Sequence, residues 1–180
     1  MYCENQIFSK LWLIEMLAAV FPEPPRRIRI LGGWAGLQAL LIRWLWAPGA
    51  SVVSVDLDPE AVACAKLLSE PFAEEGGLVF ETEDLFRHLK VSPARPDELI
   101  ICTIAEHLAR PEDLLHSLPA ASWVAVQGSS DTGPADHVSA FATMDSFRAK
   151  FPLATVLFEG KLEWRESTRW MRIGQIGSVE

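Results

Sequence analysis

The chain has 180 residues, of which 49% are hydrophobic, and it carries a formal net charge of −8 at pH 7. A chain of this length can bury one substantial core, so we expect a single domain over residues 1–180. The negative charge offers no electrostatic surface to a phosphate backbone, which argues against a nucleic-acid partner. Arg26, Arg27 and Arg29 form a tight basic cluster, which we interpret as the solvated start of a strand rather than a binding patch.

The three cysteines, Cys3, Cys64 and Cys102, are odd in number and widely separated. No Cys-x-x-Cys or His-rich spacing accompanies them, so we predict neither a disulfide framework nor a metal site. No apolar run reaches the roughly 18–20 residues that span a bilayer, and no basic leader precedes a small-residue cleavage site. We therefore expect a reduced, cytoplasmic protein with no membrane partner.

The first predicted element is a helix from Gln6 to Val20, in which apolar residues recur at helical spacing. Three prolines, Pro22, Pro24 and Pro25, then end the helical pattern. We expect this helix to cover one edge of a sheet.

A strand, a glycine turn, a helix and a second strand follow. The first strand enters a turn that contains Gly32, Gly33 and Gly36, and a backbone without Cβ atoms lets a ligand approach closely. The second strand, Val52 to Val55, delivers Asp56 about 20 residues after the last glycine, the offset at which a carboxylate meets a ribose in nucleotide-binding units. A tight turn without any ligand is the alternative interpretation.

The other predicted elements continue the alternation of helices and strands. Asp58 is expected to cap a helix that starts at Pro59 and runs through Leu68. In chain order, the predicted elements are a helix at Gly36–Trp46, strands at Leu78–Glu81, Glu98–Thr103 and Ser122–Gln127, a short helix at Met144–Phe151, and final strands at Leu153–Trp164 and Trp170–Gln175. The polar turn at residues 165–168 predicts that the last two strands form a hairpin.

Residues 28–127 resemble the class I S-adenosylmethionine-dependent methyltransferases. Ile-Leu-Gly-Gly-Trp-Ala-Gly lies where that family has an acid followed by Gly-x-Gly-x-Gly, and Val-Asp-Leu-Asp-Pro-Glu resembles its second motif. The sequence departs from the pattern at Trp34, which stands at the middle glycine, and at Ile30, which stands at the acid. The resemblance implies S-adenosyl-L-methionine as cofactor, bound by Gly32, Gly33, Trp34, Gly36, Asp56 and Leu57.

The resemblance also implies a fold and a lid. The family ends with a reversed seventh strand beside the sixth, and five strands followed by a hairpin agree with that arrangement. We thus expect an α/β fold with a doubly wound, Rossmann-like, mostly parallel seven-stranded sheet and a C-terminal antiparallel hairpin. The N-terminal helix is often a lid in this family, which would bring Tyr2 and Glu4 near the substrate; a frayed terminus is the alternative.

Two acidic segments follow strands at the edge of the sheet where ligands bind. By resemblance, Asp84 accepts the adenine amino group and Leu85 supplies a backbone amide, whereas a helix cap is the alternative for Asp84. Glu106 and His107 lie at the family's catalytic position, where a His beside a Glu can take a proton near neutral pH. A solvated pair ahead of a helix is the alternative for Glu106 and His107.

The end of the fifth strand and the polar loop after it provide two further catalytic candidates, Gln127 and His137. A hydrogen bond at the strand end is the alternative for Gln127. We predict methyl transfer to a small organic acceptor, because that reaction mainly requires an in-line approach and the chain shows no basic face for a large substrate.

Other functions stay open. A cyclase or lyase would use S-adenosylmethionine itself as substrate, whereas a non-catalytic binding subunit would be consistent with Trp34 in the turn. A nicotinamide dehydrogenase fits less well, because Gly-x-Gly-x-x-Gly is missing. A homodimer is compatible with each of these functions.

Overall fold

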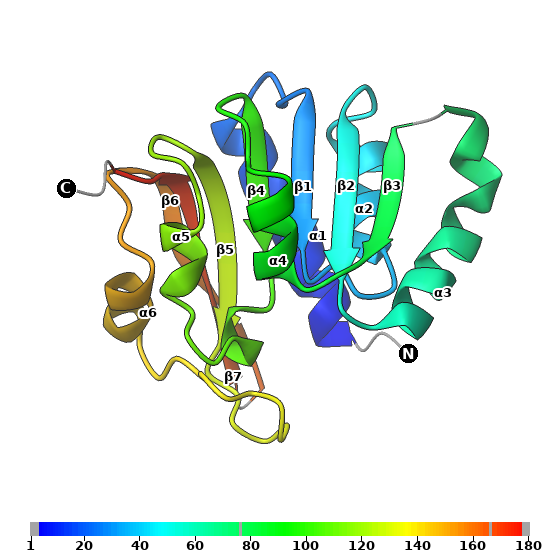
Figure 1. The fold of residues 1–180 in the computed structure, drawn as a ribbon. Coiled ribbons are helices and arrows are strands. Elements are labelled where there is room, and N and C mark those ends of the chain that lie inside the picture. The colour runs from blue at the N-terminus through cyan, green and yellow to red at the C-terminus, as the bar shows by residue number, and fades with distance from the viewer. Residues whose placement is uncertain (1–3, 76, 166, 178–180) are drawn as a thin grey trace.

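The computed structural model describes residues 4–75, 77–165 and 167–177, and places within them a seven-stranded sheet of order β3-β2-β1-β4-β5-β7-β6 (Figure 1). The strands are β1 (Arg27–Leu31), β2 (Ser51–Asp56), β3 (Leu78–Thr82), β4 (Glu98–Cys102), β5 (Trp123–Ser129), β6 (Thr155–Trp164) and β7 (Ser167–Gln175). The helices are α1 (Glu4–Val20), α2 (Leu37–Leu45), α3 (Pro59–Ser69), α4 (Leu85–Val91), α5 (Asp113–His116) and α6 (Met144–Lys150), with 3₁₀ helices η1 (Glu70–Glu75) and η2 (Ala105–His107).

The pairing of the strands confirms the predicted fold class. Strands β1 to β5 are parallel to one another, whereas β7 runs antiparallel to both β5 and β6. Since β7 lies between β5 and β6, the C-terminal hairpin inserts its second strand into the sheet. The carboxyl ends of β1, β2 and β4 meet at one edge, where ligands bind in open α/β sheets.

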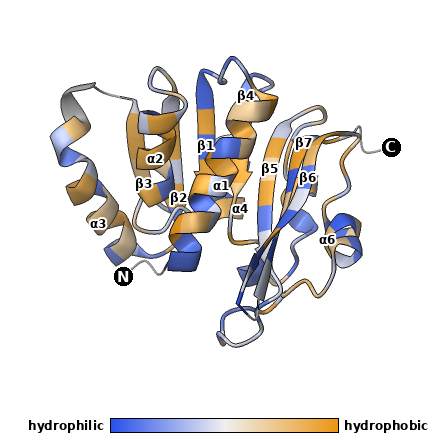
Figure 2. Ribbon diagram, turned by 180° about the vertical axis from the view of Figure 1, so that it is seen from behind, coloured by the Kyte–Doolittle hydropathy of each residue, from blue (hydrophilic) through white to orange (hydrophobic). Residues whose placement is uncertain are grey.

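Helices cover both faces of the sheet, because alternate residues of each buried strand point to opposite sides. In β4, Leu99 and Ile101 pack in one core with α1, α2 and α3, while Ile100 and Cys102 pack in a second core with α4, α5 and α6. Figure 2 shows hydrophobic residues concentrated in the central strands and a hydrophilic far end of the β6–β7 hairpin. Among the described residues, no helix is both long and apolar enough to cross a bilayer.

Several sequence predictions need correction. Helix α1 lies over a face of the sheet, beside α2 and against β6 and β7, rather than at its edge. Strand β5 continues to Ser129, because its last residues pair with β7. Arg29 is buried and pairs through two nitrogens with the Glu98 carboxylate, so the basic cluster is not fully solvated. Of the predicted hairpin turn, Ser167 already belongs to β7, and Glu166 lies outside the described residues.

Two helix starts form as the sequence predicts. The Asp58 side chain accepts hydrogen bonds from the amides of Glu60 and Ala61, so it caps α3. Gly36 precedes α2 with a φ of 79°, and a Cβ at this position would lie 2.7 Å from the Cβ of Ala65 and 2.8 Å from the ring of Phe80. The glycine therefore lets α2 begin close to α3 and β3.

Replacing Gly36 by alanine should destabilise the fold. The left-handed backbone and the contact with Ala65 both oppose a Cβ, so we expect the free energy of unfolding to fall by about 1–3 kcal/mol. Urea denaturation measures the change. Gly49→Ala is the matched control, because a Cβ on Gly49 would meet no atom within 4 Å; equal stability of the two variants would contradict the packing argument.

Candidate active site

In the turn between β1 and α2, every second residue has a left-handed backbone conformation. Gly32 has a φ of 73°, Trp34 of 44° and Gly36 of 79°. A side chain in this region costs roughly 1–2 kcal/mol, so Trp34 adopts the conformation that glycine would take most easily. The departure from the family's glycine pattern thus changes the side chain at this position and keeps a left-handed backbone.

The Asp56 carboxylate holds this turn against the end of β2. One oxygen accepts a hydrogen bond from the Trp34 amide at 2.6 Å, and the other accepts one from the Asp58 amide at 3.0 Å. The amides of Gly32 and Gly33 both donate to the Val55 carbonyl, at 2.9 and 3.1 Å. Since each carboxylate oxygen has two lone pairs, Asp56 keeps acceptor capacity for a further donor.

Two adjoining cavities open at this edge of the sheet. The smaller has a volume of about 450 Å³ and reaches toward β3, and the larger has about 750 Å³ and reaches toward α1 and β7. Both are lined by Gly32, Asp56, Leu57, Ile104 and His107. The predicted ribose ligand, Asp56, therefore lies where the two cavities meet.

The glycines of the turn contact other parts of the protein. A Cβ on Gly32 would lie 2.3 Å from the Cδ1 atom of Ile104, and one on Gly33 would lie 1.9 Å from the Ser54 hydroxyl oxygen. Gly33 and Gly36 line neither of the two cavities, whereas Gly32 and Trp34 do. Ile104, which sequence analysis did not select, lies against Gly32 and lines both cavities.

Asp84 and Leu85 line the smaller cavity, as the adenine assignment requires. The Asp84 side chain also accepts a hydrogen bond from the Arg87 amide at 2.9 Å, so the helix-cap alternative is realised at the start of α4. The two roles are compatible, because a carboxylate accepts several hydrogen bonds. Phe86 adds an aromatic side chain to the same lining.

A buried ion pair lies at the end of β4. Glu106 is 1% exposed, and its Oε1 atom is 3.2 Å from a guanidinium nitrogen of Arg169 on β7. The same nitrogen donates to the Thr103 carbonyl at 3.4 Å. Glu106 Oε2 and Arg169 Nε have no hydrogen-bond partner among the described residues. Glu106 is thus no solvated residue, and both members of the pair line the larger cavity.

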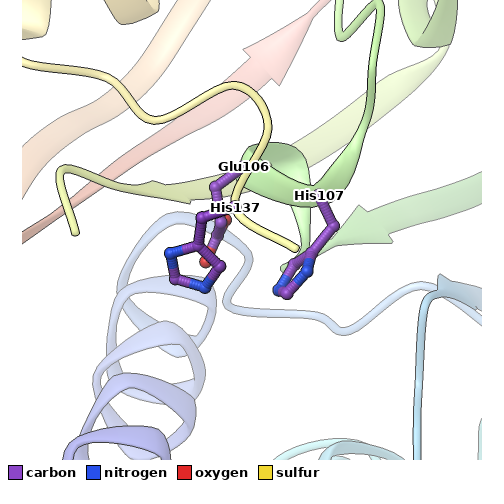
Figure 3. Close-up of side chains that lie close together, drawn as sticks. All are labelled: Glu106, His107 and His137. Carbon is purple, nitrogen blue, oxygen red and sulfur yellow. The ribbon is translucent and has the colours of Figure 1, made fainter. Parts of the chain in front are cut away.

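Two histidines lie beside this pair. His107 and His137 contact edge to face with ring centroids 4.7 Å apart, and Figure 3 shows both rings directed into the same space as the Glu106 carboxylate. His107 Nδ1 is 3.1 Å from a carboxylate oxygen of Asp136. His137 Nδ1 is 2.6 Å from the Asp131 carbonyl. The structure therefore brings together three of the four predicted catalytic residues.

The fourth candidate, Gln127, lies elsewhere. Its side chain is fully buried, its amide nitrogen donates to the Ser9 carbonyl at 3.1 Å, and it lines neither cavity. The structure favours the alternative of a hydrogen bond at the strand end, which here joins β5 to α1. Cys102 is no nucleophile candidate either, because burial raises the pKa of its thiol to about 12.

Helix α1 forms one wall of the larger cavity through Gln6, Ser9 and Lys10. Glu4 instead lies 3.7 Å from Arg165 in an exposed ion pair, and Tyr2 and Cys3 lie outside the described residues. Residues further along α1, and not the predicted Glu4, therefore line the cavity.

No family model matches the chain, and no curated protein matches its sequence. Solved structures do match its fold. Magnesium protoporphyrin IX methyltransferase ChlM from Synechocystis PCC 6803, with bound SAM, is 13% identical with a TM-score of 0.65, over 96% of this chain and 82% of that one. The N-methyltransferase NodS from Bradyrhizobium japonicum WM9, in complex with S-adenosyl-L-homocysteine, is 12% identical with a TM-score of 0.67, over 95% and 88%.

The N-terminal domain of EvdMO1 with SAH bound is 14% identical with a TM-score of 0.64, over 97% of this chain and 85% of that one. Against a longer EvdMO1 chain, this chain spans 41% of the length. This chain has the class I methyltransferase fold.

The buried pair gives a stability prediction. Replacing Arg169 by methionine leaves the buried Glu106 carboxylate without its cation, which costs about 3–5 kcal/mol when one partner of such a pair is removed. We expect chemical denaturation at neutral pH to show this loss. The double variant Glu106→Gln/Arg169→Met should recover part of it, because no uncompensated charge remains.

Arg27→Met is the control for this prediction, because Arg27 pairs with Asp97 at the surface and both side chains are largely solvated. Its loss of stability should be far smaller. An Arg169→Met variant as stable as Arg27→Met would show that the pair contributes no buried electrostatic interaction.

Proposed function

We propose that this protein is an S-adenosylmethionine-dependent methyltransferase that acts on a small organic acceptor. The observation that carries the proposal is the position of the Asp56 carboxylate, at the end of β2, beside the left-handed turn, and in the lining of both cavities. Structures of the same fold with bound SAM or SAH, those of ChlM, NodS and EvdMO1, support the choice of cofactor.

The residues of the cleft suit the three parts of this cofactor. Asp84 and Leu85 would hold the adenine in the smaller cavity, and Asp56 would accept hydrogen bonds from the ribose hydroxyls. The methionine part would extend past Gly32 and Trp34 into the larger cavity. When bound, the cofactor supplies an electrophilic methyl group on its sulfonium.

The acceptor would occupy the rest of the larger cavity. A volume of about 750 Å³ lies within the range of pockets that take small molecules, and the net charge of −8 argues against a nucleic-acid substrate. Because His107 Nδ1 faces a carboxylate oxygen of Asp136, its proton belongs there and Nε2 keeps a lone pair. His107 would take the acceptor's proton through that nitrogen as the methyl group is transferred. We also propose that the protein forms a single domain, is located in the cytoplasm and can assemble as a homodimer.

The ribose assignment is tested by Asp56→Asn. The amide removes the charge and one acceptor oxygen, so the binding of S-adenosylhomocysteine should weaken by about 1–3 kcal/mol, which is roughly 5- to 150-fold in Kd. Isothermal titration calorimetry measures the affinity, and circular dichroism verifies the fold. Asp97→Asn, at the opposite end of the sheet and paired with Arg27, controls for the loss of one negative charge. Unchanged affinity in Asp56→Asn would remove the ribose role.

The products distinguish methyl transfer from its rivals. With S-adenosylmethionine and a panel of small amines, phenols and carboxylic acids, mass spectrometry should detect S-adenosylhomocysteine only where an acceptor is present. Methylthioadenosine formed without any acceptor would instead establish a cyclase or lyase. If calorimetry detects no binding of S-adenosylmethionine or S-adenosylhomocysteine, the proposal fails and the result supports a non-catalytic subunit of this fold.

A further inference from the structure

Three side chains with metal-binding chemistry converge in the larger cavity. Glu106 and His107 belong to η2, His137 belongs to the loop after β5, and one ligand atom of each lies within 4.8 Å of the others. Figure 3 shows the carboxylate and the two rings directed toward one another. The predicted absence of a metal site rested on the spacing of cysteines and histidines along the chain, which does not detect residues that only the fold brings together.

A polar contact on Nδ1 orients each histidine for coordination. His137 Nδ1 lies 2.6 Å from the Asp131 carbonyl, and a carbonyl only accepts, so the proton of a neutral ring is on Nδ1. His107 Nδ1 faces the Asp136 carboxylate at 3.1 Å with the same consequence. Both rings thus keep their lone pair on Nε2. Metal-binding histidines are usually fixed in this manner, by a carbonyl or carboxylate on the other nitrogen.

The Glu106 carboxylate supplies an independent sign of a ligand. Its residue is 1% exposed, and Oε2 has no hydrogen-bond partner among the described residues, although Oε1 pairs with Arg169. A buried carboxylate oxygen without a partner carries a penalty that a cation would remove.

Backbone hydrogen bonds attach the loop that carries His137 to η2, the 3₁₀ helix of Glu106 and His107. The Ser139 amide donates to the Glu106 carbonyl at 2.9 Å, and the Phe141 amide donates to the Ser129 carbonyl at 2.8 Å. The first of these hydrogen bonds connects the loop to η2, and the second connects it to the end of β5. Together they keep His137 beside Glu106 and His107. The arrangement is therefore built into the fold.

We propose that Glu106, His107 and His137 bind one divalent transition-metal ion, of the class of Zn²⁺ or Fe²⁺. Two imidazoles and one carboxylate suit such ions, whereas Mg²⁺ and Ca²⁺ prefer oxygen ligands. Lys10 and Arg169 line the same cavity, and their positive charges repel a cation. The affinity for the metal ion would therefore come from coordination by the two imidazole nitrogens rather than from the net charge of the cavity. The ligand atoms of the three residues lie within 4.8 Å of one another, whereas ligands around zinc lie about 3.3 Å apart in a tetrahedron, so binding of the ion would draw the three side chains closer together. Three protein ligands leave coordination positions open to the cavity for water or for an oxygen of a bound molecule.

Titration of the EDTA-treated, dialysed protein with Co²⁺ and with Zn²⁺ tests the site without S-adenosylmethionine. We expect one Co²⁺ per chain, with a visible absorption band that Zn²⁺ abolishes. His137→Ala, a change in a surface loop, should weaken binding at least tenfold while the far-ultraviolet circular dichroism stays unchanged. Glu106→Gln should also weaken Co²⁺ binding at least tenfold if the variant folds. If it does not fold, the affinity of His137→Ala alone tests the proposal.

Two controls separate this site from other clusters. His116→Ala removes an imidazole at the end of α5, outside the larger cavity, and should keep wild-type affinity. Glu81→Gln removes a ligand from a second group, Glu81, Glu83 and His88, and should also leave the Co²⁺ signal intact. Absence of Co²⁺ and Zn²⁺ binding, full affinity in His137→Ala, or a preference for Mg²⁺ would each overturn the proposal. Because S-adenosylmethionine plays no part in this experiment, its outcome is independent of whether methyl transfer is found.

Discussion

The turn after β1 is the constraint on which the rest of the cleft depends. Its three left-handed residues, Gly32, Trp34 and Gly36, reverse the chain within a few residues, and each such residue disfavours a side chain. The Asp56 carboxylate offsets the cost at Trp34 by accepting its amide hydrogen bond at 2.6 Å. As a result, the end of β2 and the start of α2 are fixed relative to each other, and the two cavities open where these elements meet.

The Glu106–Arg169 pair fixes the other side of the cleft. It joins the segment after β4 to β7, and so depends on the insertion of β7 beside β5. A buried carboxylate is costly without its cation, so the two residues stabilise the fold only together. Glu106 in turn accepts the Ser139 amide through its carbonyl. The ion pair and this backbone hydrogen bond together connect β7, η2 and the loop that carries His137.

The two proposals assign different tasks to the same nitrogen. With no ion bound, His107 Nε2 has a lone pair available to take a proton from an acceptor. With an ion bound, that lone pair is a ligand, and an acceptor oxygen on the ion would lose its proton more readily because a metal lowers its pKa. Asp136 serves both cases, since its carboxylate keeps the proton of His107 on Nδ1. Metal dependence of any activity found would distinguish the two cases.

Local signals in the sequence determined the elements and their order. Apolar periodicity, the prolines after α1, the Asp58 cap and the glycine at position 36 act between residues close in the chain, and the structure forms each of them. The strand count and the final hairpin then left few topologies. The site was predictable where it follows a strand end, as at Asp56, Asp84, Glu106 and His107. The tertiary structure alone revealed Arg169, Asp136 and Ile104 as part of the cleft, and placed Gln127 outside it.

The position of Arg169 depends on the strand register. Arg169 faces Glu106 because β5 and β7 pair with Ser129 opposite Arg169, and a shift of one residue would turn its side chain to the other face. No pattern along the chain records that register, because it is set by side-chain packing between strands distant in sequence.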